Sequence, residues 1–117
     1  VLVTNIRAAE ITQVWRLGWS GDYNDAHSFL HVMTGGNASN LTRYANEEYD
    51  ELTHRAASQV DPDRRRLYLE EAERVMLSDH PVIPLYVFVN KHLVSPAVRG
   101  WEDNVLDYHY SRHLSLD

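Results

Sequence analysis

The sequence lacks cysteine altogether, which excludes a disulfide scaffold and any zinc site built from thiolates. It also lacks an apolar run approaching the ~20 residues that a helix needs to span a bilayer. Positive charge is scarce, since 11 Lys and Arg residues stand against 17 Asp and Glu residues and leave a formal net charge of −6. Recognition of nucleic acid needs a basic stripe, and none is present, so nucleic acid is excluded as a partner.

The remaining composition is that of a folded chain. Hydrophobic residues make up 44% of the 117 positions and charged residues 24%, unlike the low-hydrophobicity, high-charge pattern of disordered chains. This length is enough for one modest domain. Neither an internal repeat nor a low-complexity segment divides it.

The segment from Ile11 to Trp19 is predicted to be a strand, because it is dense in aromatic and β-branched residues. Its apolar residues fall on both faces, which indicates a buried position in a sheet. Gly18 and Gly21 then interrupt the pattern. The next four residues, Asp22–Asp25, favour a turn, because Asn and Asp side chains can bond their own backbone. A cation, two flat apolar surfaces and a carboxylate therefore lie within seven or eight positions: Arg16, Trp15, Trp19 and Asp22.

Two helices are predicted after this turn. The first is short and covers Ala26–Met33. The second runs from Glu47 to about Gln59, with Asn46 as its N-cap and acidic residues in its first turn, where they complement the helix dipole. Its apolar stripe, at helical spacing, consists of Tyr49, Leu52 and Ala56.

A third, longer helix is predicted from Pro62 to about Leu77 or Ser78, with Asp61 as its N-cap and the proline at the first helical position. His80–Pro81 ends it, because proline disfavours helix in the residue before it. The residues expected on its buried face are Tyr68, Ala72, Val75 and Met76. Those expected in solvent are Arg64, Arg65, Glu70, Glu71 and Arg74.

A second hydrophobic strand is predicted over Val82–Val89, with Pro84 near its start as suits an edge or a strand entry. A turn follows at Pro96–Gly100, and Val105–Tyr110 is strand-like. The order of elements is strand, two long helices, strand and C-terminal tail. The predicted fold class is therefore α/β.

Four segments of the chain together resemble one family of proteins. They are Arg16–Asp25 with Phe29–Leu30, Tyr44–Leu52, Arg65–Leu77 and Val82–Val94. In order and spacing they are similar to the C-terminal third of extracytoplasmic solute-binding proteins of the oligopeptide/dipeptide ABC-importer family. Ala26 and Glu47 depart from the pattern, because the family usually has proline at both positions. The resemblance covers nearly the whole chain from about Ile11, but only part of the family's length.

The resemblance implies a fragment of a two-lobed periplasmic-binding-protein fold. Residues 1–88 would belong to the C-terminal ligand-binding lobe, and residues 89–117 would cross over and return toward the N-terminal lobe. The implied function is capture of oligopeptides or dipeptides for the membrane permease of an ABC importer. The implied location is the periplasm or another place outside the cytoplasmic membrane, where a lipid anchor in a missing N-terminal segment is an alternative to a free protein. A signal sequence would lie in an N-terminal part that this chain does not include. A nickel chelate, haem or a sugar remains an alternative solute on the same fold.

The same resemblance implies the ligand-binding residues. Asp22 would pair with the α-ammonium group of a bound peptide, whereas the residues themselves allow an Asx turn as its alternative role. Trp19 and Phe88 would line side-chain pockets or lie in the core. Arg16 would meet a peptide carboxylate or lie along the surface. Tyr23 and Asn24 would position the loop.

Metal and enzyme chemistry find little support in the sequence. His27 and His31, like His109 and His113, are spaced four apart as in helical metal-binding pairs, and Asp25 and Asp107 lie nearby. Zinc normally needs three or four protein ligands, and neither pair has a clear third, so we assign no metal site and no cofactor. The segment Gly18–Asp22 lacks the second glycine of a hydrolase nucleophile elbow, so we expect no enzyme.

A further hypothesis concerns the isolated chain. A piece of a two-lobed protein leaves strand edges and apolar faces uncovered, and both favour pairing with another chain. We therefore expect the 117-residue chain to self-associate.

Overall fold

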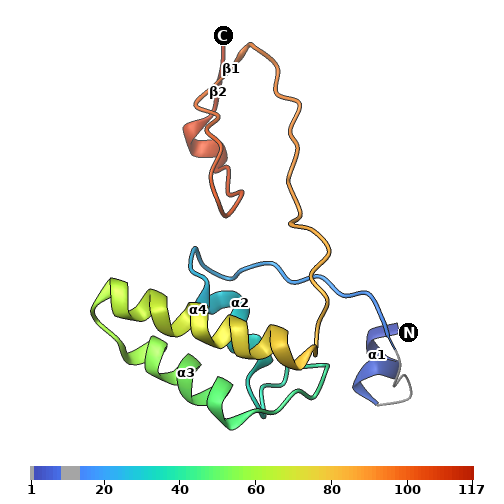
Figure 1. The fold of residues 1–117 in the computed structure, drawn as a ribbon. Coiled ribbons are helices and arrows are strands. Elements are labelled where there is room, and N and C mark those ends of the chain that lie inside the picture. The colour runs from blue at the N-terminus through green and yellow to red at the C-terminus, as the bar shows by residue number, and fades with distance from the viewer. Residues whose placement is uncertain (1, 9–13) are drawn as a thin grey trace.

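A computed structural model describes residues 2–8 and 14–117 and is dominated by helices (Figure 1). The helical elements are α1 (Leu2–Arg7), α2 (His27–Leu30), η1 (His31–Met33), α3 (Glu47–Ser58), α4 (Pro62–Asp79) and η2 (Ser111–His113). The strands are β1 (Val98–Arg99) and β2 (Ser115–Leu116), which form an antiparallel pair. None of the helices within the described ranges has the length and apolar character needed to cross a membrane.

The two long helices begin where their caps predict. The Asn46 side chain accepts a hydrogen bond from the Tyr49 N–H, and Asp61 accepts from two N–H groups in the first turn of α4. All three bonds satisfy donors that a helix start leaves unpaired. The predicted end of α4 is confirmed within a residue or two, because His80 adopts a left-handed conformation (φ 58°) directly before Pro81.

The core lies where α2, α3 and α4 meet. A short connection joins α3 and α4, which run side by side, and α2 lies against both (Figure 1). Tyr49 is fully buried among them and donates its hydroxyl to the Leu30 carbonyl at the end of α2. The buried apolar residues of this cluster are Leu30, Tyr49, Ala56, Leu69, Ala72 and Met76.

The C-terminal segment stands apart from this helical body. An extended stretch leads from the end of α4 to a small hairpin in which Val98 pairs with Leu116 and Arg99 with Ser115 (Figure 1). Gly100 turns the chain after β1 with a φ of 79°, and a Cβ there would lie 1.9 Å from the His113 carbonyl oxygen. Glycine is the residue that fits this position.

The predicted strands are wrong for this chain as it stands. Residues 11–13 of the first lie outside the described residues, and 14–19 form no strand. The second, Val82–Val89, is extended but unpaired, and Val105–Tyr110 forms a turn and coil. The N-terminal helix α1 was not among the predicted elements. An extended segment becomes a strand only beside a partner, and no described segment pairs with these stretches.

The unpaired stretch leaves a row of apolar side chains in solvent. The large residues between Ile83 and Val89 are between 63% and 88% exposed. Monomeric proteins rarely expose such a contiguous apolar surface. We call residues 83–89 the exposed apolar segment.

Replacing Tyr49 with phenylalanine tests the core. We expect Tyr49→Phe to lower the free energy of unfolding by about 1–2 kcal/mol, because the Leu30 carbonyl loses its side-chain donor in a buried place. Urea unfolding followed by circular dichroism measures the change. Tyr68→Phe is the control, because the Tyr68 hydroxyl makes no hydrogen bond within the described residues. Equal effects of the two substitutions would contradict the role given to the Tyr49 hydroxyl.

The exposed apolar segment predicts self-association of the isolated chain. Light scattering during gel filtration should show a mass that rises with protein concentration. A Val87→Lys, Val89→Lys double variant should shift the chain toward monomer, because charge on an unpaired edge opposes pairing. Val60→Lys is the matched control, since Val60 is exposed as a lone apolar residue between α3 and α4. A wild-type chain that stays monomeric at all concentrations would refute the prediction.

Candidate ligand-binding site

The turn that carries the predicted site residues is attached to α2 through one buried serine. Ser28 is fully buried, and its hydroxyl oxygen accepts a hydrogen bond from the Asp22 backbone N–H at 2.7 Å. Its carbonyl accepts a second bond from the Trp19 indole N–H at 3.0 Å. The indole and the Asp22 backbone are therefore held by the same residue. A polar group buried in this way is costly unless it is paired, so the two bonds fix the approach of the turn.

The Asp22 carboxylate itself is exposed and unengaged. Within the described part of the chain, no hydrogen bond or ion pair reaches it. The Asx turn considered as its alternative role forms instead at Asp25, whose carboxylate accepts the His27 N–H at 2.8 Å. Asp22 therefore presents a negative charge to solvent, while its backbone N–H is held by the buried Ser28 hydroxyl.

Asp25 also joins the turn to α4. Its two carboxylate oxygens accept hydrogen bonds from Arg65 at 2.6 and 2.8 Å, and both side chains are largely covered. Arg65 was expected in solvent on the outer face of the helix, and the structure corrects that expectation. The Arg65 hydrogen bonds lower the pKa of Asp25 below its ordinary value of 3.8, with smaller contributions from the His27 N–H and from charge. A bidentate pair of this kind is among the stronger charge-assisted contacts.

Tyr23 and Asn24 lie on the outer part of the turn. The Tyr23 hydroxyl is 2.7 Å from His27 Nδ1, and the His27 ring stacks in turn on His31 with centroids 5.2 Å apart. Burial lowers the pKa of His27, which favours its neutral form. The Asp25 N–H donates a hydrogen bond to the Tyr23 carbonyl across Asn24. Asn24 therefore occupies the tip of the turn.

Arg16 and Phe88 gather around a third residue. The Arg16 guanidinium donates to the Tyr86 hydroxyl and lies 6.0 Å from the centre of that ring. The centroids of the Phe88 and Tyr86 rings are 6.3 Å apart. All three side chains are exposed, and they bring the segment before the turn next to the exposed apolar segment.

The structure thus divides the six predicted residues between two places. Trp19, Asp22, Tyr23 and Asn24 lie on the turn above α2, whereas Arg16 and Phe88 lie around Tyr86. Within the described residues, no hydrogen bond or ring contact joins the two groups. Sequence reasoning missed Ser28 and Tyr86, since a serine buried inside a four-residue helix carries no periodic signal.

The turn combines an exposed carboxylate with aromatic surface. A fixed, exposed carboxylate beside aromatic surface suits a cationic group such as an ammonium. The Ser28 hydroxyl is buried and already accepts a hydrogen bond from the backbone. The parallel stacking of His27 and His31 directs their rings alongside each other rather than toward a shared ion.

Several curated proteins are similar to this chain in sequence. The periplasmic oligopeptide-binding protein OppA of Haemophilus influenzae is 32% identical over 111 residues, which are 94% of this chain and 20% of that protein. The periplasmic murein peptide-binding protein MppA of Escherichia coli is 31% identical over 104 residues, covering 88% of this chain and 19% of that protein. The dipeptide-binding protein DppE of Bacillus subtilis is 37% identical over 79 residues, covering 68% of this chain and 14% of that protein. No family model matches the chain.

These similarities confirm the resemblance read from the motifs. The chain belongs to the family of oligopeptide- and dipeptide-binding proteins. It spans about a fifth of the length of the first of these relatives. The relatives named are binding proteins, which agrees with the expectation of a binding role rather than an enzymatic one.

The Asp25–Arg65 pair predicts a stability that depends on pH. The folded-state pKa of Asp25 is lowered, so its contribution is present above the unfolded value and is lost as pH falls through the folded value. At neutral pH, Asp25→Asn should lower the free energy of unfolding by about 1 kcal/mol. The difference between the variant and the wild type should begin to shrink as pH falls below about 4, and it should vanish only below the lowered folded-state pKa of Asp25.

Urea unfolding of the two proteins across this pH range measures the effect. Arg66→Gln is the matched control, because Arg66 pairs with Glu70 on the exposed face of the same helix. Such pairs contribute a few tenths of a kcal/mol. A pH-independent difference between Asp25→Asn and wild type would show that the pair does not act through its charge.

Proposed function

We propose that the chain is part of a longer solute-binding protein that captures oligopeptides or dipeptides. It would act in the periplasm, outside the cytoplasmic membrane, and deliver its ligand to the membrane permease of an ABC importer. Relatives that are named for binding such peptides support this proposal. The observation that carries it is the exposed, unengaged carboxylate of Asp22 on a turn fixed by Ser28.

Asp22 is the residue that pairs with the free amino end of the peptide. An α-ammonium group placed against a fixed carboxylate forms a short charge-assisted bond, about twice as strong as a neutral one. Because the Asp22 backbone is already bonded to a buried group, little conformational freedom is lost when the ligand arrives. The pairing selects peptides with a free amino end and places no constraint on their side chains.

The residues beside Asp22 provide the surrounding surface. Trp19 has 43% of its surface exposed although its indole N–H is bonded, so one part of the ring remains available for apolar contact. Tyr23 is equally exposed and is oriented by His27. Asn24, at the tip of the turn, offers an amide to the ligand main chain.

Arg16 and Phe88 form a second contact region through Tyr86. The guanidinium is held by the Tyr86 hydroxyl and remains exposed, which suits it to a peptide carboxylate. Phe88 adds an aromatic surface next to it. The two groups of residues would then contact different parts of an extended ligand.

The proposed lobes follow the predicted boundary near residues 88–90. Residues 1–88 belong to the C-terminal ligand-binding lobe, and residues 89–117 cross over toward the N-terminal lobe. The exposed apolar segment supports this arrangement, because its extended backbone has the form of a strand whose neighbours lie elsewhere in the longer protein. Two lobes joined by such crossings close over a ligand by hinge motion.

Replacing Asp22 tests the proposal in the longer protein. Asp22→Asn should weaken binding of peptides with a free amino end about tenfold to a hundredfold, the loss of one charge-assisted hydrogen bond. N-acetylated peptides should bind weakly to the wild type and equally weakly to the variant. Calorimetric titration with a pool of short peptides and its acetylated counterpart measures both.

Asp103→Asn is the control, because it makes the same change of charge at another exposed aspartate. It should leave both affinities unchanged. Equal wild-type affinity for free and acetylated peptides would refute the role of Asp22. Absence of binding to every peptide would refute the peptide class and favour the alternative solutes, namely a nickel chelate, haem or a sugar.

A further inference from the structure

The C-terminal segment brings together three metal-ligating side chains that are separated in the sequence. Nε2 of His92 lies 2.7 Å from Oδ1 of Asp107, and Nε2 of His109 lies 2.9 Å from the same oxygen. The three ligand atoms all lie within 4.8 Å of one another. Within the described residues, this is the one group of three such side chains.

The surrounding structure holds each of the three side chains in place. Asp107 stands in a turn with a φ of 57°, and its second carboxylate oxygen accepts a hydrogen bond from the Asn90 side chain at 2.7 Å. Trp101 stacks on the His109 ring with centroids 3.7 Å apart and planes 12° apart. His92 lies beside the same indole at 5.1 Å. Neighbours that orient ligands in this way are typical of metal sites.

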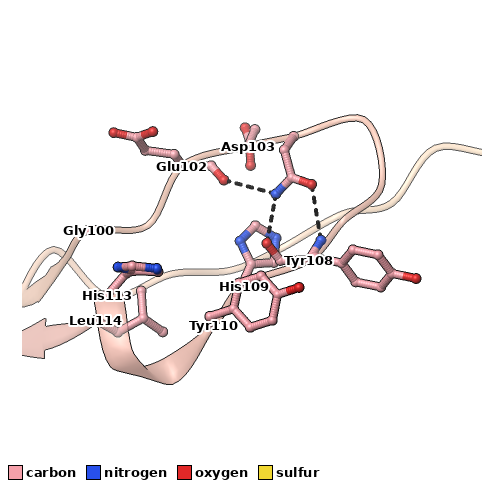
Figure 2. Close-up of a pocket in the computed structure, with 9 residues that line it drawn as sticks. Gly100, Glu102, Asp103, Tyr108, His109, Tyr110, His113 and Leu114 are labelled. Carbon is pink, nitrogen blue, oxygen red and sulfur yellow. Dashed lines mark hydrogen bonds between the residues drawn. The ribbon is translucent and has the colours of Figure 1, made fainter. Parts of the chain in front are cut away.

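The turn itself is stabilised by one asparagine. The Asn104 side chain donates to the Tyr108 carbonyl at 3.0 Å and accepts from the Tyr108 N–H at 3.1 Å. Figure 2 shows these bonds at the edge of a pocket of 390 Å³ to which His109 contributes one wall. The side chains of His92 and Asp107 are 31% and 30% exposed, so an ion can reach the cluster from solvent.

We propose that His92, Asp107 and His109 form a binding site for a divalent first-row transition metal such as Zn²⁺. Two imidazoles and one carboxylate are a donor set that zinc, nickel and copper bind well. Three protein ligands leave a further coordination position for water or another small ligand. This proposal is independent of the peptide-binding function.

The distances fit a site that adjusts slightly on binding. Bonds of about 2.1 Å place the ligand atoms of a tetrahedral site about 3.4 Å apart. The His–Asp contacts of 2.7 and 2.9 Å would therefore lengthen by roughly half an ångström as the ion replaces the protons between them. Rotation of the His92 side chain, which is 31% exposed, supplies this movement without displacing the turn.

The sequence pairs considered earlier are not the ones that converge. His113, four residues after His109, accepts a hydrogen bond from Arg112 and packs edge-on against Tyr110. The segment containing both histidines is not a continuous helix, since η2 covers only Ser111–His113. His92, earlier in the chain, is the histidine that converges with His109 on Asp107.

Calorimetric titration of the untagged 117-residue chain with ZnCl₂ tests the site. We expect saturable binding of one ion per chain. His92→Gln and His109→Gln should each weaken binding at least about tenfold. His113→Gln is the matched control and should bind as the wild type does. Titration with Co²⁺ adds a spectroscopic readout, because coordinated Co²⁺ in a tetrahedral site absorbs visible light strongly.

Far-UV circular dichroism checks that each variant keeps α3 and α4, which lie outside the C-terminal segment. Asp107→Asn is a second variant at the shared ligand, since asparagine tolerates the left-handed backbone there while its amide is a poorer ligand. It should lose binding while folding normally. No saturable binding by the wild type would overturn the proposal, as would equal losses in His92→Gln and His113→Gln.

Discussion

The hydroxyl of Tyr49 joins α3 to the end of α2. It is buried at the centre of the core and bonds to the carbonyl at the end of α2, which is too short to be stable alone. Desolvation raises the pKa of Tyr49, so the group remains a hydrogen-bond donor. Ser28 of α2 holds the turn through the Asp22 N–H. The position of Asp22 therefore depends indirectly on the hydrogen bond between Tyr49 and Leu30.

A second contact attaches the turn to α4. Arg65 on α4 reaches the Asp25 carboxylate, so the turn is attached to α2 through Ser28 and to α4 through a bidentate pair. Asp22 and Asp25, three residues apart, therefore have different environments. One carboxylate is committed to the fold, and the other is left for solvent or a ligand. The turn therefore presents one exposed carboxylate on a backbone that is fixed by the contacts of its neighbours.

The C-terminal segment follows a different organisation. It has little apolar core, and polar contacts through Asp107 and Asn104 hold its turn instead. A polar cluster in such a place stabilises local structure whether or not an ion is bound, and an ion would tighten it further. The extended stretch between the two parts, including the exposed apolar segment, contributes backbone and side chains that remain unpartnered within the described residues.

Much of the helical structure was predictable from local chemistry. The caps at Asn46 and Asp61 and the break at His80–Pro81 are set by neighbouring residues, so the sequence predicts the two long helices within a residue or two. The motif around Asp22 likewise indicates the family, and sequence similarity confirms it. The strands were predicted wrongly, because a hydrophobic run specifies an extended segment but not the partner that makes it a strand.

What the sequence by itself determined is therefore local: helix starts and ends, the turn at Asp22–Asp25, and the family. Only the tertiary structure decided which carboxylate is free, because Arg65 lies forty positions from Asp25 and helical periodicity placed it in solvent. It also decided that His92 rather than His113 joins His109. Contacts between distant residues depend on how elements pack, and spacing along one element carries no information about them.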